Sequence, residues 1–280
     1  MTKRITKLIN TSKNQFKDFA EIVFYKEPFE VTYGKMDKKT VAQRPRKFVN
    51  DGGDLPTPIG DATYNDLFES IKRSNRRAKD NFYGYGLCNR WDYFCTFTVS
   101  INDFESTDEA TKYYWKLFKK KLQYRFPDIK ILAVPERHKK GNLHFHALLG
   151  NCNLDNLLAF GIVKYGKQIY NLPLWDKGFS TVVKIENPNV IETQLKAVAY
   201  FVKYLAKEDR ITYNQKKYYR TNNLDFKTKE LSLSSLNSIE KSINKDDILF
   251  TKETNQLVVF RVKAFTNPSI CAITDTELPW

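Results

Sequence analysis

Two histidines separated by one residue are the side chains whose type and spacing most clearly suggest chemistry. His144 and His146 lie in the apolar run LHFHALLG, and the 280-residue chain contains a single further histidine, His138. Side chains at positions i and i+2 of a strand point to the same face. Both imidazoles would therefore project together, with Phe145 entering the core on the other side, and such a pair can bind one metal ion.

A third ligand is expected from the preceding strand, residues 129–138, which a Lys-Lys-Gly turn joins to the histidine strand. If Gly141 takes the left-handed position of a three-residue loop, Glu136 pairs opposite His144 and shares the metal-facing side with His138. A two-residue loop would turn Glu136 away. Glu136 is thus the predicted third ligand, and His138 could replace or assist it. Imidazoles with one carboxylate suit Mn or Zn, whereas Mg normally takes more oxygen ligands.

A predicted helix over residues 190–208 supplies candidate nucleophiles. Its buried stripe should contain Leu195, Val198, Val202 and Leu205. A different face carries Lys196, Tyr200, Lys203, Tyr204 and Lys207. An ordinary amphipathic helix, with tyrosines at the core edge and solvated lysines, would show the same pattern.

Tyrosine needs assistance to act as a nucleophile, because the phenol has a pKa of about 10. Neighbouring lysine charges favour the phenolate, and a metal ion that polarises a phosphate makes the phosphorus more reactive. The histidine and tyrosine motifs together predict phosphoryl transfer from DNA to tyrosine.

Composition favours a globular, intracellular protein that binds nucleic acid. Hydrophobic residues make up 41% of the chain, and the net charge is +14, which attracts polyanions. The four cysteines show no CxxC pair, as expected of reduced thiols in the cytoplasm. No segment is apolar enough to span a membrane.

A second basic surface is expected on the helix that begins near residue 64. An apolar stripe of Leu67, Phe68, Ile71, Ala78 and Phe82 should face the core. Phosphate contacts are predicted for Lys72, Arg73, Arg76 and Arg77 of this helix and for Lys196 of the tyrosine helix. A solvated basic face is the alternative.

Strands joined by hairpins as well as helices indicate an α+β fold with a central antiparallel sheet of about five strands, flanked by helices. Strands are expected at 93–101, 129–138, 143–150, 178–186 and 216–224, with a helix at 107–125 capped by Ser106 and Glu109. The predicted domains are an extension over 1–62 with two short strands and a loop at 36–62, a catalytic domain over 63–235, and a C-terminal extension over 236–280 with a helix and a hairpin.

The motifs resemble those of the HUH endonucleases, and more closely the rolling-circle replication initiator (Rep) proteins of small plasmids and single-stranded DNA phages. The resemblance covers roughly residues 64–225. A strand motif is matched by Phe94 to Thr98, the histidine motif by His144 to His146, and the tyrosine helix by Tyr200 to Lys207. The pattern YxxKYxxK is similar to that of two-tyrosine phage initiators, while KYxxK favours Tyr204 as the first nucleophile.

The resemblance implies a ferredoxin-like nuclease fold and metal-dependent nicking and joining of single-stranded or hairpin origin DNA. A divalent ion, Mn or Mg, would be held by His144, His146 and Glu136, and attack by tyrosine would leave a 5′-phosphotyrosine and a free 3′-OH. Host helicase and polymerase would be partners, because the chain has no GxxxxGK[ST] phosphate loop.

Two other functions fit the same motifs. A transposase of the HUH type would use the same chemistry, and a nonenzymatic DNA-binding replicon regulator would use the histidines structurally. Residues 1–62 and 236–280 carry no interpretable motif, so origin recognition, dimerisation and assembly into a homo-oligomer stay open for them.

Overall fold

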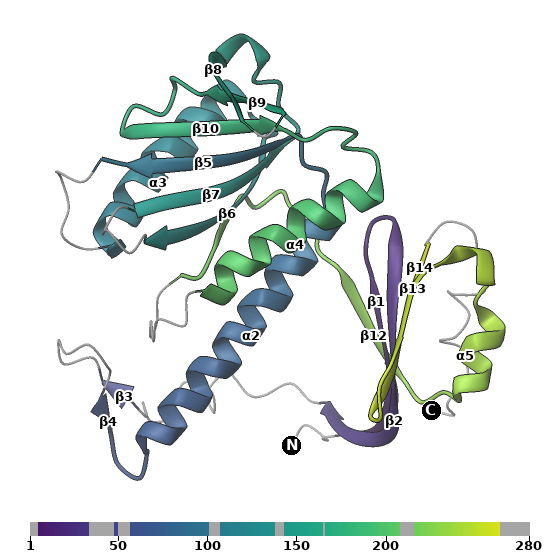
Figure 1. Cartoon of the computed structure of the whole chain (residues 1–280). Coiled ribbons are helices and arrows are strands. Elements are labelled where there is room, and N and C mark those ends of the chain that lie inside the picture. Colours follow the sequence, from purple (N-terminus) through teal and green to yellow (C-terminus); the bar gives the residue numbers. More distant parts are fainter. Residues whose placement is uncertain are drawn as a thin grey trace. The chain divides into compact units, whose positions relative to one another are not determined.

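The computed structural model describes residues 5–33, 48–49, 57–100, 107–137, 143–164, 166–207 and 216–263. The chain forms two compact units (Figure 1): Arg46–Asp225, and a unit that combines Met1–Pro45 with Phe226–Trp280. Each unit contains one large antiparallel sheet, and the described residues include four α-helices. The predicted α+β class is confirmed.

The Arg46–Asp225 unit is built on a sheet of seven strands in the order β11-β6-β7-β5-β10-β9-β8. The expected number was about five, and the two further strands form the hairpin of β8 and β9, which was not predicted. The strands are β5 (Tyr93–Val99), β6 (Lys130–Arg137), β7 (Leu143–Gly150), β8 (Ala159–Lys164), β9 (Lys167–Asn171), β10 (Gly178–Lys184) and β11 (Tyr219–Arg220).

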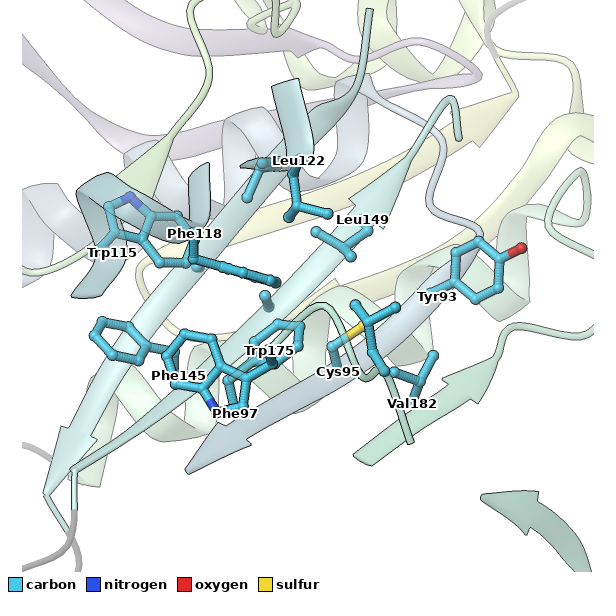
Figure 2. Close-up of a cluster of buried hydrophobic side chains, with 14 of the residues drawn as sticks. Tyr93, Cys95, Phe97, Trp115, Phe118, Leu122, Phe145, Leu149, Trp175 and Val182 are labelled. Carbon is cyan, nitrogen blue, oxygen red and sulfur yellow. The ribbon is translucent and has the colours of Figure 1, made fainter. Parts of the chain in front are cut away.

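One face of this sheet holds the main hydrophobic core, because alternate residues of each strand point into it. In β5 the buried residues are Tyr93, Cys95, Phe97 and Val99. Helix α3 (Thr107–Arg125) covers the face with Trp115, Phe118 and Leu122, as Figure 2 shows. The helix has the predicted bounds, and Ser106 of the predicted cap lies outside the described residues.

The opposite face carries two helices, α2 (Tyr64–Cys88) and α4 (Ile191–Lys207). Helix α2 begins with a capping box between Thr63 and Asp66. The predicted stripe of α2 is buried except at Phe68, whose side chain is exposed. The prediction was wrong there because Phe68 follows Leu67 directly and so lies about 100° further round the helix.

Helix α4 buries a slightly different stripe from the one predicted. Val198, Phe201 and Leu205 are buried together with Gln194, whereas Leu195 and Val202 are only half-buried. The Phe201 ring stacks with Phe82 of α2, and the two ring centroids are 6.1 Å apart. Aromatic packing between the helices therefore rotates α4 toward Phe201.

Close approach of α2 and α4 depends on a glycine. A Cβ atom added to Gly86 would lie 2.5 Å from Cγ1 of Val198. The Gly86 carbonyl also accepts a hydrogen bond of 2.7 Å from the indole Nε1 of the buried Trp91. Gly86 thus fixes how near the tyrosine helix can come to α2.

We expect Gly86→Ala to lower the free energy of unfolding of this unit by about 1–3 kcal/mol, because Val198 is β-branched and cannot easily move away. Urea unfolding followed by tryptophan fluorescence measures the change. In a Val198→Ala background the same substitution should cost less. An equal cost in both backgrounds would show that this contact does not limit the approach.

The second unit consists of a five-stranded sheet and helix α5 (Leu236–Ser242), with the strands in the order β12-β1-β2-β14-β13. The predicted C-terminal hairpin and helix are confirmed. The two short strands expected near residues 21–35 are instead one long strand, and β1 and β12 were not predicted. The strands are β1 (Ile5–Gln15), β2 (Phe19–Tyr33), β12 (Thr228–Ser232), β13 (Ile248–Glu253) and β14 (Leu257–Lys263).

Several short elements lie between the longer ones. Within the predicted loop at 36–62, a small two-stranded sheet pairs β3 (Phe48–Val49) with β4 (Thr57–Pro58). Two 3-10 helices, η2 (Asp155–Leu157) and η3 (Lys245–Asp247), precede β8 and β13. In the described segments, no helix is both long and apolar enough to cross a membrane.

Candidate metal and tyrosine site

The two histidines lie on the face of the sheet opposite the main core. Strand β7 alternates as predicted: Phe145 is fully buried against α3, with its ring 5.5 Å from that of Trp115. His144 and His146 occupy the other face, and their rings are nearly parallel, with centroids 6.3 Å apart. Strand β7 lies between β6 and β5, so both neighbouring strands can supply groups to the imidazoles.

Threonines of β5 hold the histidine rings. Thr96 pairs with His146 and Thr98 with His144. The Thr96 hydroxyl lies 3.1 Å from Nδ1 of His146, and the Thr98 hydroxyl lies 2.9 Å from Nδ1 of His144. When each Nδ1–H donates to its threonine, Nε2 carries the lone pair that binds a metal ion.

Sequence reasoning placed Thr96 and Thr98 in a motif but gave them no role. The signal was available, since threonines at i and i+2 of one strand match histidines at i and i+2 of the next. What the sequence could not supply was the pairing of β5 with β7, which joins segments about fifty residues apart.

Glu136 of β6 reaches the histidine pair from the other side. Strands β6 and β7 pair with Glu136 opposite His144, the register that a three-residue loop predicts. The Glu136 carboxylate bonds diagonally to His146, with 2.7 Å between Oε2 and Nε2. His138 and Gly141 lie outside the described residues.

The donor set of this face suits a divalent cation, with two imidazoles and one carboxylate. In the geometry observed, however, Glu136 forms a hydrogen-bonded pair with Nε2 of His146 alone. Across the part of the chain that the structure describes, no three His, Cys, Asp or Glu side chains converge in an arrangement that could hold a metal ion. Metal binding by this face therefore stays a prediction.

We expect Thr98→Val to reduce the apparent metal affinity about 10- to 100-fold, because loss of a partner at Nδ1 frees the ring orientation and tautomer. Thr98→Ser keeps the hydroxyl and should behave as the original protein. A metal titration of DNA cleavage measures the affinity, and high metal concentration should restore the rate. Equal metal affinity in the Val and Ser variants would exclude this role for Thr98.

Helix α4 lies on the same face as the histidines. Phe94, Thr96 and Thr98 are alternate residues of β5, so they share that face. The Phe94 ring contacts both Phe201, at 4.8 Å between centroids, and Tyr200, at 5.2 Å. Tyr200 is thus next to the strand that orients the imidazoles, and its side chain is 47% exposed, which leaves room for a substrate.

Other predicted residues of α4 are placed in part. Lys196 and Lys203 are exposed. The helix contains Tyr204 and Lys207, one and nearly two turns beyond Tyr200, although their side chains lie outside the described part of the structure. The two tyrosines and the lysines stay predicted catalytic residues.

A buried glutamine ties the start of α4 to the sheet. Gln194 accepts a hydrogen bond of 3.2 Å from the backbone N–H of Trp91, and its amide nitrogen donates to the carbonyls of Trp91 and Pro188 at 3.1 and 2.8 Å. Trp91 lies two residues before β5. The position of the tyrosine helix is therefore coupled to the strand that carries the threonines.

A cavity of about 550 Å³ opens beside Tyr200. Its lining includes Phe94, Lys167, Lys184 and Lys196. Lys184 pairs with Asp155 at 2.8 Å. Lys196, predicted to bind DNA, is thereby brought next to the candidate nucleophile.

The basic residues of α2 separate into two groups. Lys72, Arg73 and Arg76 are exposed, and Lys72 bonds to Glu69 at 2.8 Å; this hydrogen bond and its charge lower the pKa of Glu69. Arg77 instead lines a cleft at the β11 edge of the sheet. The structure therefore does not bring the predicted DNA-binding residues together on one surface.

The described cysteines are not suited to nucleophilic chemistry. Cys88 and Cys95 are buried free thiols, and Cys152 is half-buried and free. Burial raises the pKa of Cys95, and burial followed by the charge of Asp92 raises the pKa of Cys152 to about 12. Because the thiolate is the reactive form, these groups are inert at neutral pH.

Comparison with known proteins was informative at the level of families. Curated proteins and solved structures gave no match. Residues 92–209 match the model of a family of replication-associated proteins of the ORF2 type. This span begins at β5 and ends just beyond α4, so it contains the threonines, the histidines and the tyrosine helix. The match supports a Rep-type replication-associated protein that binds DNA.

Proposed function

We propose that this protein nicks and rejoins DNA at a replication origin by metal-dependent transesterification, and so initiates and terminates rolling-circle replication. The observation that carries the proposal is the common face of the sheet. Two imidazoles held at Nδ1 by threonines lie on the face that helix α4 covers, and Tyr200 contacts the threonine strand through Phe94. The family match over this same span supports the role in replication.

The covalent step exchanges one phosphodiester for another. The phenol oxygen of Tyr200 or Tyr204 attacks the scissile phosphorus, the bond from phosphorus to the 3′ oxygen breaks, and the phenol proton ends on that oxygen. The products are a 5′-phosphotyrosine and a free 3′-OH that can prime synthesis. Attack by a 3′-OH, or by the second tyrosine, reverses or transfers the link, so no nucleotide hydrolysis is needed.

Each group of the site has a task in this scheme. His144, His146 and Glu136 would hold a divalent ion, Mn or Mg, which when bound withdraws negative charge from the phosphate. Thr96 and Thr98 keep the imidazoles in the ligating orientation. Lys196 and Lys203 favour the phenolate of the neighbouring tyrosine. Host helicase and polymerase would separate and copy the strands.

A covalent adduct tests the proposal most directly. The protein is incubated with Mn and single-stranded oligonucleotides that tile the candidate origin, labelled at the 3′ end, and the mixture is run on a denaturing gel. We expect label that migrates with the protein and depends on Mn. Binding to the origin without any adduct, across all oligonucleotides and metals, would favour a nonenzymatic regulator.

A further inference from the structure

A strongly basic cleft lies at the β11 edge of the seven-stranded sheet. It has a volume of about 750 Å³ and is lined by α2, by α3 and by residues 216–222. Among its described lining residues there are six cationic side chains and no carboxylate. The cations are Arg77, Lys116, Lys119, Lys216, Lys217 and Arg220.

The positive charges of this cleft are close to one another. The Lys119 ammonium donates a hydrogen bond of 3.3 Å to the carbonyl of Arg220. Burial, followed by the charges of Lys216 and Arg220, lowers the pKa of Lys119. A bound anion would relieve this repulsion, since opposite charge favours the ammonium form.

Aromatic packing makes the floor of the cleft rigid. Consecutive residues at β11 pack in opposite directions: the Tyr218 ring lies 5.9 Å from Phe82 of α2, and the Tyr219 ring lies 5.4 Å from Trp115 of α3. The Arg220 guanidinium lies 4.5 Å from the centre of the Tyr85 ring. These contacts hold the strand and the Arg220 side chain in place before any ligand arrives, which lowers the entropy lost on binding.

We infer that this cleft binds the phosphate backbone of single-stranded DNA and is a second contact for the strand that the nuclease site cleaves. A row of cations beside aromatic side chains is the arrangement that binds single strands without reading their sequence. The cleft shares no lining residue with the histidine and tyrosine site. The inference rests on the proposed function only for the choice of DNA as the polyanion.

Salt dependence of DNA binding tests the inference. Anisotropy of a labelled oligothymidine is measured over a range of salt concentrations for the full chain and for the double variant Lys116→Gln, Lys119→Gln. Each lost phosphate contact on a single strand should reduce the slope of log affinity against log salt by about 0.7. Because two contacts are lost, we expect the slope to fall by about 1.4.

The matched control is Lys120→Gln with Lys177→Gln. Both lysines belong to the same unit, Lys120 is exposed on α3, and neither lines the cleft. The control removes the same charge and should leave the slope unchanged. Equal slopes for the cleft variant and the control would overturn the inference, once thermal unfolding confirms that both are folded.

Two further arms identify the ligand. If the cleft variant loses affinity for a duplex but not for oligothymidine, the single-strand assignment is wrong. If inorganic phosphate at the same phosphate concentration displaces oligothymidine as well as unlabelled oligothymidine does, the cleft is a simple anion site and the inference fails.

The inference and the proposed function can fail separately. The cleft variant should still form the covalent adduct at saturating DNA, and the variant Tyr200→Phe, Tyr204→Phe should keep the original salt slope. A reduced slope without any adduct in the original protein would leave the cleft in place and refute the nuclease.

Discussion

Replacing Tyr200 and Tyr204 together with Phe should abolish the covalent DNA adduct and reduce cleavage by about 10⁴-fold or more, because it removes both candidate nucleophiles of α4. Phe keeps the aromatic ring, so the contact of residue 200 with Phe94 should persist and stability should change little. The measurement is a denaturing gel with labelled origin DNA, together with the rate of oligonucleotide cleavage.

The single variants separate the roles of the two tyrosines. The KYxxK pattern predicts that Tyr204→Phe blocks the first cleavage, whereas Tyr200→Phe would impair the joining step. Tyr124→Phe is a matched control, because Tyr124 is 93% exposed on α3 and should be neutral. An adduct that survives the double substitution would refute the assignment of the nucleophile to α4.

Replacing His146 with Ala should reduce cleavage by more than about 100-fold and leave binding of single-stranded DNA within about twofold. Loss of the imidazole removes a predicted metal ligand, and loss of an outer partner alone already costs about 10- to 100-fold. The change also deprives Glu136 of its partner at 2.7 Å. Cleavage rates and binding without metal are measured on the same preparation.

Chelation provides the parallel control for His146. A chelator should stop cleavage by the original protein, and added Mn should restore it, whereas Mn should not restore the His146→Ala variant. Because His146 is buried, thermal unfolding of the variant is needed beside the activity. Parallel loss of cleavage, DNA binding and stability would instead assign His146 a structural role.

The local parts of the site were predictable from sequence. Alternation along β7 gives the common face of His144 and His146, and a short loop sets the register that brings Glu136 opposite His144. Helical spacing gives the bounds of α4 within one residue. In each case the signal lies within about twenty consecutive residues.

The remainder depends on pairing between distant segments. Strand β8 was missed because its apolar residues Phe160, Ile162 and Val163 are exposed, so it lacks the alternation that marks a half-buried strand. The burial of Phe201 in place of Val202 follows from contacts with Phe82 and Phe94, which lie more than a hundred residues away. The cleft at β11 likewise requires α2 and α3 to meet residues 216–222.

The pairing of β2 with β14 has a consequence for synthesis of the chain. Strands β1 and β2 are made first, but β2 finds its second neighbour only when Leu257–Lys263 has been translated. At about 5–20 residues per second, the early hairpin waits on the order of ten seconds or more with open edges. Residues 46–225 can complete their sheet on the ribosome during this interval. Exposed strand edges invite aggregation, so the polar and charged residues of β1, KLINTSKNQ, protect the nascent protein while it waits.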